Sequence, residues 1–365
     1  MKCNILCKFA SEKHHMKGII TSDKIQKFSK LITEARRIAI ATHTRPDGDA
    51  IGSCVATACF IREKFGKDAG IVLADPCPGN LDFIFDCTGR DRIFRYDLSR
   101  TEAESWIGES DLIICQDCNG FSRTGELQHI LKSSVAAKVL IDHHLDPQEA
   151  EFDLCFSETK ISSASELVFW ILSAMPGIDG DEGLIPMHGL RAIMTGMTTD
   201  TNNFANSVFP STLQMASRLL EAGVDRDGII DELYNRYREN RLRMTGYALK
   251  DKMVILPEGA AFIILTADEL AEYDIEEGEL EGLVNMPLGI GSVKMSILLK
   301  EDDGYFRVSV RSKRGISANR FAAQYFNGGG HEQASGGRLY FPKDIACSND
   351  APEYVKKALT TFFKA

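Results

Sequence analysis

Short apolar runs alternate with longer amphipathic stretches in the first half of the chain, and this alternation restricts the fold most strongly. The apolar runs lie at 38–42, 69–74, 112–116 and 139–142. Residues 50–65, between the first two runs, have helical periodicity and end at Gly66, a residue typical of helix C-termini. Strands that alternate with helices predict a parallel sheet with flanking helices, so the expected fold class is α/β.

The second half of the chain changes its pattern twice. Helical periodicity dominates from Ser163 to about Lys250, and a unit with strands begins near Val254. In that unit we expect strands at 261–266, 292–299, 306–311 and 337–341, and a helix at 317–326. We therefore expect four segments: an extended or poorly ordered N-terminus (1–20), a first domain (21–225), a connecting helix (226–253) and a smaller α/β domain (254–365).

Length, hydropathy and charge exclude several classes of protein. A chain of 365 residues can form two domains, each with its own core. No apolar stretch reaches the ~18 residues that a membrane span needs, and the apolar N-terminal part is too short for a secretory signal. We expect a cytoplasmic protein that does not bind membranes and begins at Met1 or Met16. A net charge of −10 argues against a protein that coats long nucleic acids.

Charge is nevertheless unevenly distributed. Residues 305–340 carry six basic residues and one acidic residue, a balance that suits a small anionic ligand. The ten cysteines show no disulfide framework, which fits a reducing compartment. Cys115 and Cys118 form a C-x-x-C pattern, but it closes an apolar run rather than opening a helix, and no second pair completes a zinc site. We favour incidental cysteines over redox or zinc chemistry.

Carboxylates and imidazoles follow the apolar elements of the first domain. These candidate ligands are His43, Asp47, Asp49, Asp117, His143 and Asp200. The carboxyl ends of parallel strands share one edge of a sheet, where open α/β sheets bind ligands. Asp117 can bridge two ions, with His43 and Asp47 on one side and the other three residues on the second. Mostly oxygen ligands with one imidazole per ion suit Mn²⁺ or Mg²⁺ better than zinc.

Each of these patterns has a simpler explanation when it stands alone. A Pro-Asp-Gly-Asp sequence is commonly a turn, an isolated Asp-His-His can be a surface loop, and a single aspartate can cap a helix. The order of the patterns is more informative, because four of them each follow an apolar element. Two ions about 3.5–4 Å apart would activate a water and stabilise the leaving oxygen of a phosphoryl group.

The motifs resemble those of a known family. His43-x3-Asp47-Gly48-Asp49, Asp117, Asp142-His143-His144 and Asp200 resemble motifs one to four of the DHH phosphoesterase superfamily. The glycine-rich sequence 328–331, together with 334–337, resembles the signature of its DHHA1 substrate-binding domain. The resemblance implies an N-terminal parallel-sheet DHH domain and a smaller C-terminal α/β DHHA1 domain. Within the superfamily the chain looks most like the nano-RNase/pAp phosphatase group.

The resemblance also implies roles for individual residues. It places one metal on His43, Asp47 and Asp117, and a second on Asp49, Asp117, His143 and Asp200. The catalytic residues implied are Asp117, His144, which would donate to the phosphate, and Asp142, which would orient its neighbours. The substrate-binding residues implied are Arg123, Arg311, Ser312, Gly329, Gly330 and His331.

The expected function is therefore that of a two-metal phosphoesterase. It would degrade very short single-stranded oligoribonucleotides to mononucleotides and dephosphorylate 3′-phosphoadenosine 5′-phosphate, using two Mn²⁺ ions or Mg²⁺. Alternatives are hydrolysis of linear or cyclic dinucleotides, polyphosphate cleavage, and a nucleotide-binding regulatory module without catalysis. A homodimer is compatible with each of these alternatives. We do not expect long nucleic acids to be substrates.

Overall fold

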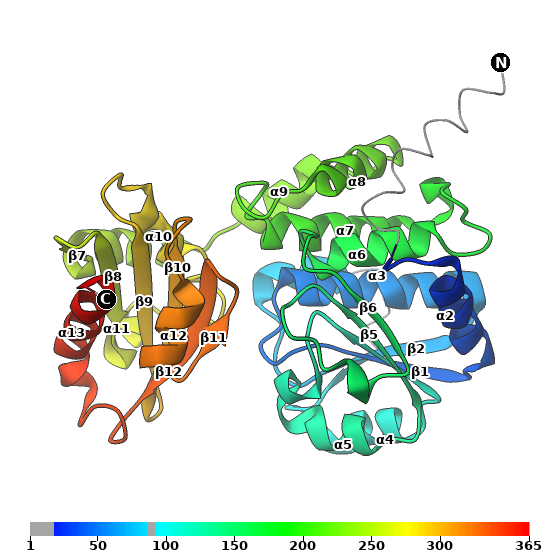
Figure 1. The fold of residues 1–365 in the computed structure, drawn as a ribbon, viewed down its shortest axis with the longest axis horizontal. Coiled ribbons are helices and arrows are strands. Elements are labelled where there is room, and N and C mark those ends of the chain that lie inside the picture. Colours follow the sequence, from blue (N-terminus) through cyan, green and yellow to red (C-terminus); the bar gives the residue numbers. More distant parts are fainter. Residues whose placement is uncertain (1–17, 86–91, 365) are drawn as a thin grey trace. The chain divides into compact units, whose positions relative to one another are not determined.

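The computed structural model describes residues 18–85 and 92–364, which form two units with a boundary between Asn235 and Arg236 (Figure 1). The expected extended N-terminus and both candidate start residues, Met1 and Met16, lie outside the described residues. Among the described helices, none combines the length and the apolar character that crossing a bilayer requires.

The first unit is built on the expected parallel sheet. Its strands are β1 (Arg37–Ala41), β2 (Asp68–Leu73), β3 (Ile93–Arg95), β4 (Leu112–Gln116), β5 (Ala137–Asp142) and β6 (Leu154–Ser157). They are arranged in the order β3-β2-β1-β4-β5-β6, and every neighbouring pair is parallel. The four strands expected from the apolar runs are confirmed within one or two residues, and β3 and β6 were not anticipated.

Helices cover both faces of this sheet (Figure 1). Those of the first unit are α2 (Ser22–Glu34), α3 (Gly48–Phe65), α4 (Arg100–Gly108), α5 (Gln128–Ser133), α6 (Ala164–Ser173), α7 (Met187–Asp200), α8 (Pro210–Glu221) and α9 (Arg226–Tyr234). Alternate residues of β1 enter two different cores. Ile38 and Ile40 pack with α2, α3, α6 and α7, whereas Ala39 and Ala41 pack with α4 and α5. Because both faces are buried, the strands read as continuous apolar runs.

The second unit is a mixed sheet with helices. Its strands are β7 (Val254–Leu256), β8 (Ala260–Leu265), β9 (Met295–Asp302), β10 (Tyr305–Ser312), β11 (Gly329–Gly330) and β12 (Ala334–Tyr340), in the order β11-β12-β10-β9-β8-β7. Only β8 and β9 are parallel among these pairs of described strands. Its helices are α10 (Glu239–Tyr247), α11 (Ala267–Glu272), α12 (Ala318–Tyr325) and α13 (Ala351–Lys364).

Strand β10 shows how this sheet divides its two faces. Phe306, Val308 and Val310 are buried in the core formed with α12 and α13. The residues that alternate with them, including Arg311, point to the opposite face, as the period of a strand requires. The α/β character expected for this part of the chain is confirmed.

The continuous connecting helix expected at 226–253 is wrong. The segment contains α9 and α10, with a break at residues 235–238, and continues from α10 as a π-helical turn at 248–252. The reason lies in packing: α9 buries Ile229 and Leu233 in the core of the first unit, whereas α10 buries Met244 in a core of the second. Arg238 at the break adopts an extended conformation and pairs with Asp274. One straight helix could not serve both cores.

Candidate metal centre

The carboxyl ends of three neighbouring strands bring the candidate ligands together. His43 lies two residues after β1, and Asp117 follows β4 directly. Asp142 is the last residue of β5, and His143 and His144 come next. Strands β1, β4 and β5 are adjacent in the sheet, so the turns that follow them adjoin. The sequence of each strand thus delivers a polar residue to the same edge.

The start of α3 contributes two carboxylates. Asp47 is the N-cap, and its Oδ1 accepts the backbone amides of Asp49 (3.0 Å) and Ala50 (3.1 Å). This arrangement leaves the Asp47 Oδ2 available to an ion. Asp49 lies in the first helical turn and is almost fully buried. Gly48, between them, is the first residue of α3. A Cβ there would lie 2.4 Å from the Thr199 hydroxyl, so the glycine permits the close approach of α7.

The same close approach continues along α3 and α7 and places Asp200. A Cβ on Gly52 would lie 2.5 Å from the Ala192 carbonyl oxygen of α7. A Cβ on Gly196 would lie 3.0 Å from Asp49 Oδ1. Because α7 packs this tightly, its last residue, Asp200, reaches the centre, with Oδ2 3.8 Å from His143 Nε2.

Asp117 is the shared member of two groups of potential ligands. Its Oδ2 lies 3.4 Å from His43 Nε2, and its Oδ1 lies 3.3 Å from His143 Nε2. One group is formed by His43, Asp47 and Asp117, and the other by Asp49, Asp117 and His143, each with ligand atoms within 4.8 Å of one another. Asp117 has a left-handed backbone conformation (φ 52°), which directs its side chain away from the strand and into the centre.

The hydrogen bond of His43 determines which ring nitrogen faces Asp117. Its Nδ1 lies 2.8 Å from the Thr44 carbonyl oxygen, which can only accept a hydrogen bond. Nδ1 must therefore carry the proton, and in the neutral ring Nε2 is free to bind an ion. A backbone carbonyl that orients a ligating imidazole in this way is common at metal sites.

The electrostatics of the centre favour added positive charge. Burial alone would lower the pKa of His43, but the carboxylates of Asp117 and Asp47 raise it to about 9. The same opposition leaves the pKa of His143 raised well above its usual value. Burial and the charges of Asp117 and Asp200 raise the pKa of Asp49, whereas hydrogen bonds from the two histidines outweigh burial and lower the pKa of Asp117. The buried carboxylates therefore require cations beside them.

The chemistry of these groups fits divalent ions. The Oδ1 of Asp117 is buried and faces two imidazole nitrogens, that of His143 at 3.3 Å and that of His144 at 3.6 Å. Four carboxylates and two imidazoles are hard to intermediate ligands, the mixture that Mn²⁺ and Mg²⁺ take. Each of the two groups of three can hold one ion, with Asp117 common to both.

A second acid–imidazole pair lies beside the ligands. His144 Nδ1 lies 2.8 Å from Asp142 Oδ1, and the His144 amide donates to Asp142 Oδ2 (3.1 Å). Asp142 is fully buried, whereas the His144 side chain retains 14% exposure. Asp142 thus fixes the orientation of the His144 ring.

Arg123 lies close to this group. Its carbonyl oxygen accepts the amide of Thr44 (2.9 Å), which joins the turn after β4 to the turn after β1. The positive charge of Arg123 is felt at His43, where it opposes protonation of the ring. The arginine is therefore placed to meet an anion that approaches the centre.

Two thiols lie on either side of Asp117 in the sequence. Cys115 and Cys118 are fully buried and unpaired, with Sγ atoms 2.9 Å apart. Their mutual hydrogen bond and burial raise the pKa of Cys118 well above its usual value. A buried thiol of raised pKa is a poor nucleophile and metal ligand, which agrees with incidental cysteines.

In the second unit, Arg311 and the glycine-rich turn occupy neighbouring strands. Arg311 pairs with Ala334 across β10 and β12, and its guanidinium donates to the Val310 carbonyl (3.0 Å). His331 closes a tight turn, donating its amide to the Ala334 carbonyl and accepting from the Ser335 hydroxyl at its own carbonyl. The turn therefore holds His331 close to Ala334, the first residue of β12.

Two of the expected substrate contacts already have hydrogen-bond partners within the chain. Ser312 is buried on the core side of β10, and its hydroxyl donates to the Ile316 carbonyl (2.6 Å), so it holds the following loop. The amide of Gly330 donates to Asn319 Oδ1 (3.0 Å), so it can bind an anion only if that bond breaks. Asn319 was missed because nothing in its local sequence marks a contact with a turn eleven residues away.

Sequence reasoning also missed the groups that hold Asp49. The backbone amides of Ala164 and Ser165, at the start of α6, donate to its Oδ2 (2.6 Å) and Oδ1 (2.8 Å). The sequence from Ser162 to Glu166 contains a serine three residues before a glutamate, a typical helix start. That signal predicts the helix end, although it does not predict the carboxylate that binds there.

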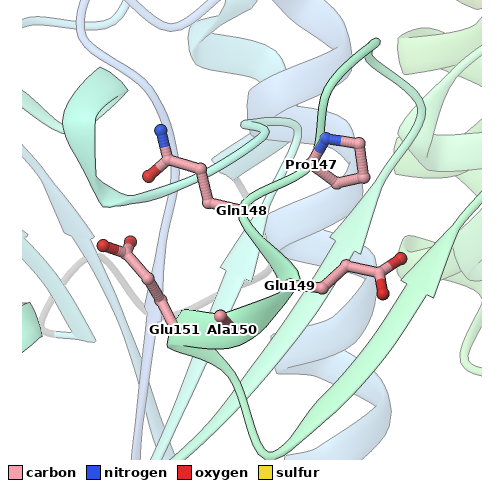
Figure 2. A pocket seen from close by; sticks show the side chains of 5 residues that line it. All are labelled: Pro147, Gln148, Glu149, Ala150 and Glu151. Atoms are coloured by element: carbon pink, nitrogen blue, oxygen red, sulfur yellow. The ribbon is translucent and has the colours of Figure 1, made fainter.

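A surface pocket elsewhere in this unit has no comparable chemistry (Figure 2). It is lined by residues 147–151 of the loop after β5. Its polar groups already have partners elsewhere in the unit: Gln148 donates to the Ser122 hydroxyl, and Glu151 forms an ion pair with Lys132. We assign no function to this pocket.

Comparison with known families agrees with both units. The model described as "DHH family, N-terminal domain" matches residues 37–197, and the model described as "DHHA1 domain" matches residues 259–360. The first match includes every candidate ligand except Asp200, and the second includes Arg311 and the glycine-rich turn.

Three individual proteins are informative relatives. The crystal structure of an exopolyphosphatase-related protein from Bacteroides fragilis is 36% identical, with a TM-score of 0.86 over 95% of this chain and 98% of that one. The bifunctional oligoribonuclease and PAP phosphatase NrnA of Bacillus subtilis is 27% identical over 83% of this chain and 89% of its own length. The cyclic-di-AMP phosphodiesterase GdpP of Geobacillus thermodenitrificans is 22% identical over 92% of this chain but only 49% of its own length.

Proposed function

Because this chain belongs to the DHH family of phosphoesterases and carries a DHHA1 domain, we propose that it hydrolyses very short oligoribonucleotides and 3′-phosphoadenosine 5′-phosphate. The observation that carries the proposal is the shared carboxylate: Asp117 belongs both to the group with His43 and Asp47 and to the group with Asp49 and His143. A structural ion pair has no need for a second such group.

The chemistry follows from how these groups are arranged. His43, Asp47 and Asp117 would hold one ion, and Asp49, Asp117, His143 and Asp200 the other. Two bound divalent ions would supply a hydroxide at neutral pH and neutralise the charge that develops on the phosphoryl oxygens. We assign Mn²⁺ first and Mg²⁺ second, since both favour oxygen ligands.

The remaining residues would bind and orient the substrate. His144, fixed by Asp142, would donate a hydrogen bond to a phosphate oxygen and so stabilise the charge that increases in the transition state. Arg123 would attract the same phosphate. In the second unit, Arg311 and His331 would bind a terminal phosphate or nucleotide, because a guanidinium matches phosphate geometry.

The choice of substrate rests on two considerations. The Bacillus subtilis relative is named as an oligoribonuclease and PAP phosphatase, and it aligns with most of this chain. The net charge of −10 disfavours long nucleic acids, whose binding depends on many phosphate contacts. A small nucleotide needs only the few cationic groups that the chain offers.

A dinucleotide phosphodiesterase is the second candidate, because the GdpP relative aligns with nearly the whole of this chain. A time course with Mn²⁺ would separate the two, using a 5′-labelled trinucleotide, 3′-phosphoadenosine 5′-phosphate, an RNA of about 24 nucleotides and cyclic di-AMP. Release of mononucleotide from the trinucleotide, with slow cleavage of the long RNA, supports the proposal. Preferential opening of cyclic di-AMP favours the second candidate, and no turnover on any substrate favours a binding module.

Asp117→Asn tests the shared ligand directly. The substitution keeps the size of the side chain but removes the charge that two ions would share, so we expect loss of activity and of at least one bound ion. Asp111→Asn is the matched control, because Asp111 precedes the same strand at the opposite edge of the sheet and accepts the amides of Arg36 and Arg37. Two ions bound to Asp117→Asn in calorimetry would refute the bridging role.

A further inference from the structure

The first turn of α6 lies against Asp49, one of the proposed ligands. Both oxygens of this carboxylate accept backbone amides from that turn, at 2.6 Å from Ala164 and 2.8 Å from Ser165. Asp49 contributes one oxygen to the second ligand group, 3.8 Å from His143 Nε2. The orientation of the carboxylate therefore depends on where the first turn of α6 lies.

Glu166, in that same turn, is an unusual carboxylate. It is fully buried, and the groups that donate to it are all neutral. Its Oε2 accepts from the amide (3.1 Å) and hydroxyl of Ser162 and from the Thr212 hydroxyl (2.7 Å). Its Oε1 accepts from the Trp170 indole (3.3 Å). A buried carboxylate is costly unless such bonds satisfy it, so these donors are held firmly in place.

The network joins three parts of the first unit. Ser162 lies in the loop that leads into α6, and the Ser163 hydroxyl caps the helix by accepting the Glu166 amide (3.0 Å). Thr212 lies in the first turn of α8, where its hydroxyl also accepts the Phe209 amide. Glu166 thus fixes the start of α6 from both sides: from the preceding loop and from a neighbouring helix.

We propose that Glu166 is a positioning residue of the metal centre. By fixing the first turn of α6, it aligns the Ala164 and Ser165 amides that hold Asp49 ready to bind an ion. Glu166 itself touches neither an ion nor a substrate. This inference rests on the proposed metal-dependent function, in which Asp49 is a ligand.

Glu166→Gln removes the charge at nearly constant shape. Whichever way the amide is placed, its NH₂ group faces at least one donor, either the Trp170 indole or the groups around Oε2. The first turn of α6 must then shift to relieve that contact, and the two amides shift with it. Groups that orient metal ligands typically change metal affinity by about 10- to 100-fold when altered, and we expect at least about a tenfold loss here.

Glu182→Gln is the matched control. Glu182, in the 3-10 turn at 182–184, accepts from the Ser173 hydroxyl at the C-terminal end of α6 (2.7 Å) and from Arg218 of α8 (3.0 Å), at the opposite end of α6 from Asp49. Altering a purely structural carboxylate that contacts α6 should lower the melting temperature and leave metal affinity unchanged. We expect Glu182→Gln to lower the melting temperature without changing metal affinity, and Glu166→Gln to weaken metal binding.

The experiment measures Mn²⁺ binding by calorimetry to the full chain, and the melting temperature with and without Mn²⁺. Support requires Glu166→Gln to bind Mn²⁺ at least about tenfold more weakly than the wild type, with Glu182→Gln unchanged. Equal affinity of Glu166→Gln and the wild type overturns the inference, as does equal weakening in both variants.

A second pair of variants decides the matter if Glu166→Gln does not fold. Thr212→Val removes one donor to Glu166 at constant size, and Thr212→Ser keeps it. Weaker Mn²⁺ binding by Thr212→Val, restored in Thr212→Ser, supports the role, whereas unchanged binding by both overturns it. Absence of Mn²⁺ binding by the wild type would overturn the proposed function itself, and this inference with it.

Discussion

Gly52→Ala tests whether the close packing of α3 on α7 sets the geometry of the metal centre. The added Cβ would lie 2.5 Å from the Ala192 carbonyl oxygen, whereas ordinary contact begins at 3.4 Å. The two helix backbones would have to separate by about 0.9 Å, the difference between these distances, because neither atom lies on a flexible side chain. Asp49 lies at the start of α3 and Asp200 at the end of α7, so the separation would reach two ligands.

The expected magnitude combines two opposing effects. Overpacking a helix contact typically costs about 1–3 kcal/mol, and a backbone oxygen at 2.5 Å belongs at the upper end of that range. Replacing glycine by alanine within a helix returns about 1 kcal/mol. We therefore expect a net loss of about 1–2 kcal/mol in the free energy of unfolding, together with weaker binding of Mn²⁺.

The stability of the first unit and its binding of Mn²⁺ can both be measured in the full chain. The two tryptophans, Trp106 and Trp170, belong to the first unit, so urea unfolding followed by tryptophan fluorescence reports the stability of that unit. Calorimetry reports the binding of Mn²⁺. Gly108→Ala is the control, since a Cβ at the end of α4 would meet nothing within 4 Å and should leave stability equal or higher. If Gly52→Ala were as stable as the wild type and bound Mn²⁺ equally well, the packing argument would be refuted.

Three further predictions concern the metal, the substrate and pH. Chelation of the ions should lower the melting temperature of the first unit, because ions bound only to the native state at 100 times their Kd add about 2.7 kcal/mol; calorimetry with and without chelator checks this. Arg311→Ala should raise KM for a trinucleotide with little change in kcat, since the residue binds the substrate away from the reacting atoms; a large fall in kcat at unchanged KM would contradict this role. Burial would raise the pKa of Glu269, but hydrogen bonds from Lys252 and Tyr247 lower this pKa to about 2. The ionised Glu269 therefore stabilises the native state fully above the ordinary pKa near 4.5, and this stabilisation is lost as the pH falls through about 2. Glu269→Gln should flatten that part of the stability profile measured by scanning calorimetry, and Glu272→Gln, on the same helix, should not.

Strands of the first unit were predictable to the extent that they were long and apolar. The four runs that contain β1, β2, β4 and β5 are buried on both faces, which makes each strand a continuous apolar segment. Strand β3 has three residues and β6 has four, at the two edges of the sheet. So few residues carry no usable period, and their pairing depends on neighbours far away in the sequence.

Helix boundaries that depend on tertiary packing were not predictable. The sequence around residues 226–253 has helical character throughout, but the chain breaks it at 235–238 to bury Leu233 in one core and Met244 in another. Local propensity does not reveal which core a residue will enter. Asn235 is the C-cap of α9, and its side chain donates to Asp231 in the last turn (2.6 Å).

The clustering of the candidate ligands was predictable, whereas the groups that hold Asp49 were not. Each expected ligand follows an apolar element, and the folding of that element is enough to bring it to the edge of the sheet. The amides of Ala164 and Ser165 have no side-chain signature, and they reach Asp49 across 115 and 116 residues of sequence. The orientation of Ser312 follows from its register, because the alternation of β10 turns its side chain into the core.

The electrostatics explain how so many carboxylates can be buried before any ion binds. With a pKa of about 9, His43 is protonated at neutral pH. Although burial opposes it, the carboxylates of Asp117 and Asp200 raise the pKa of His143 as well. Burial and the charge of Asp117 raise the pKa of Asp49, so the centre disfavours a further negative charge. A divalent ion that binds here must displace the proton on His43.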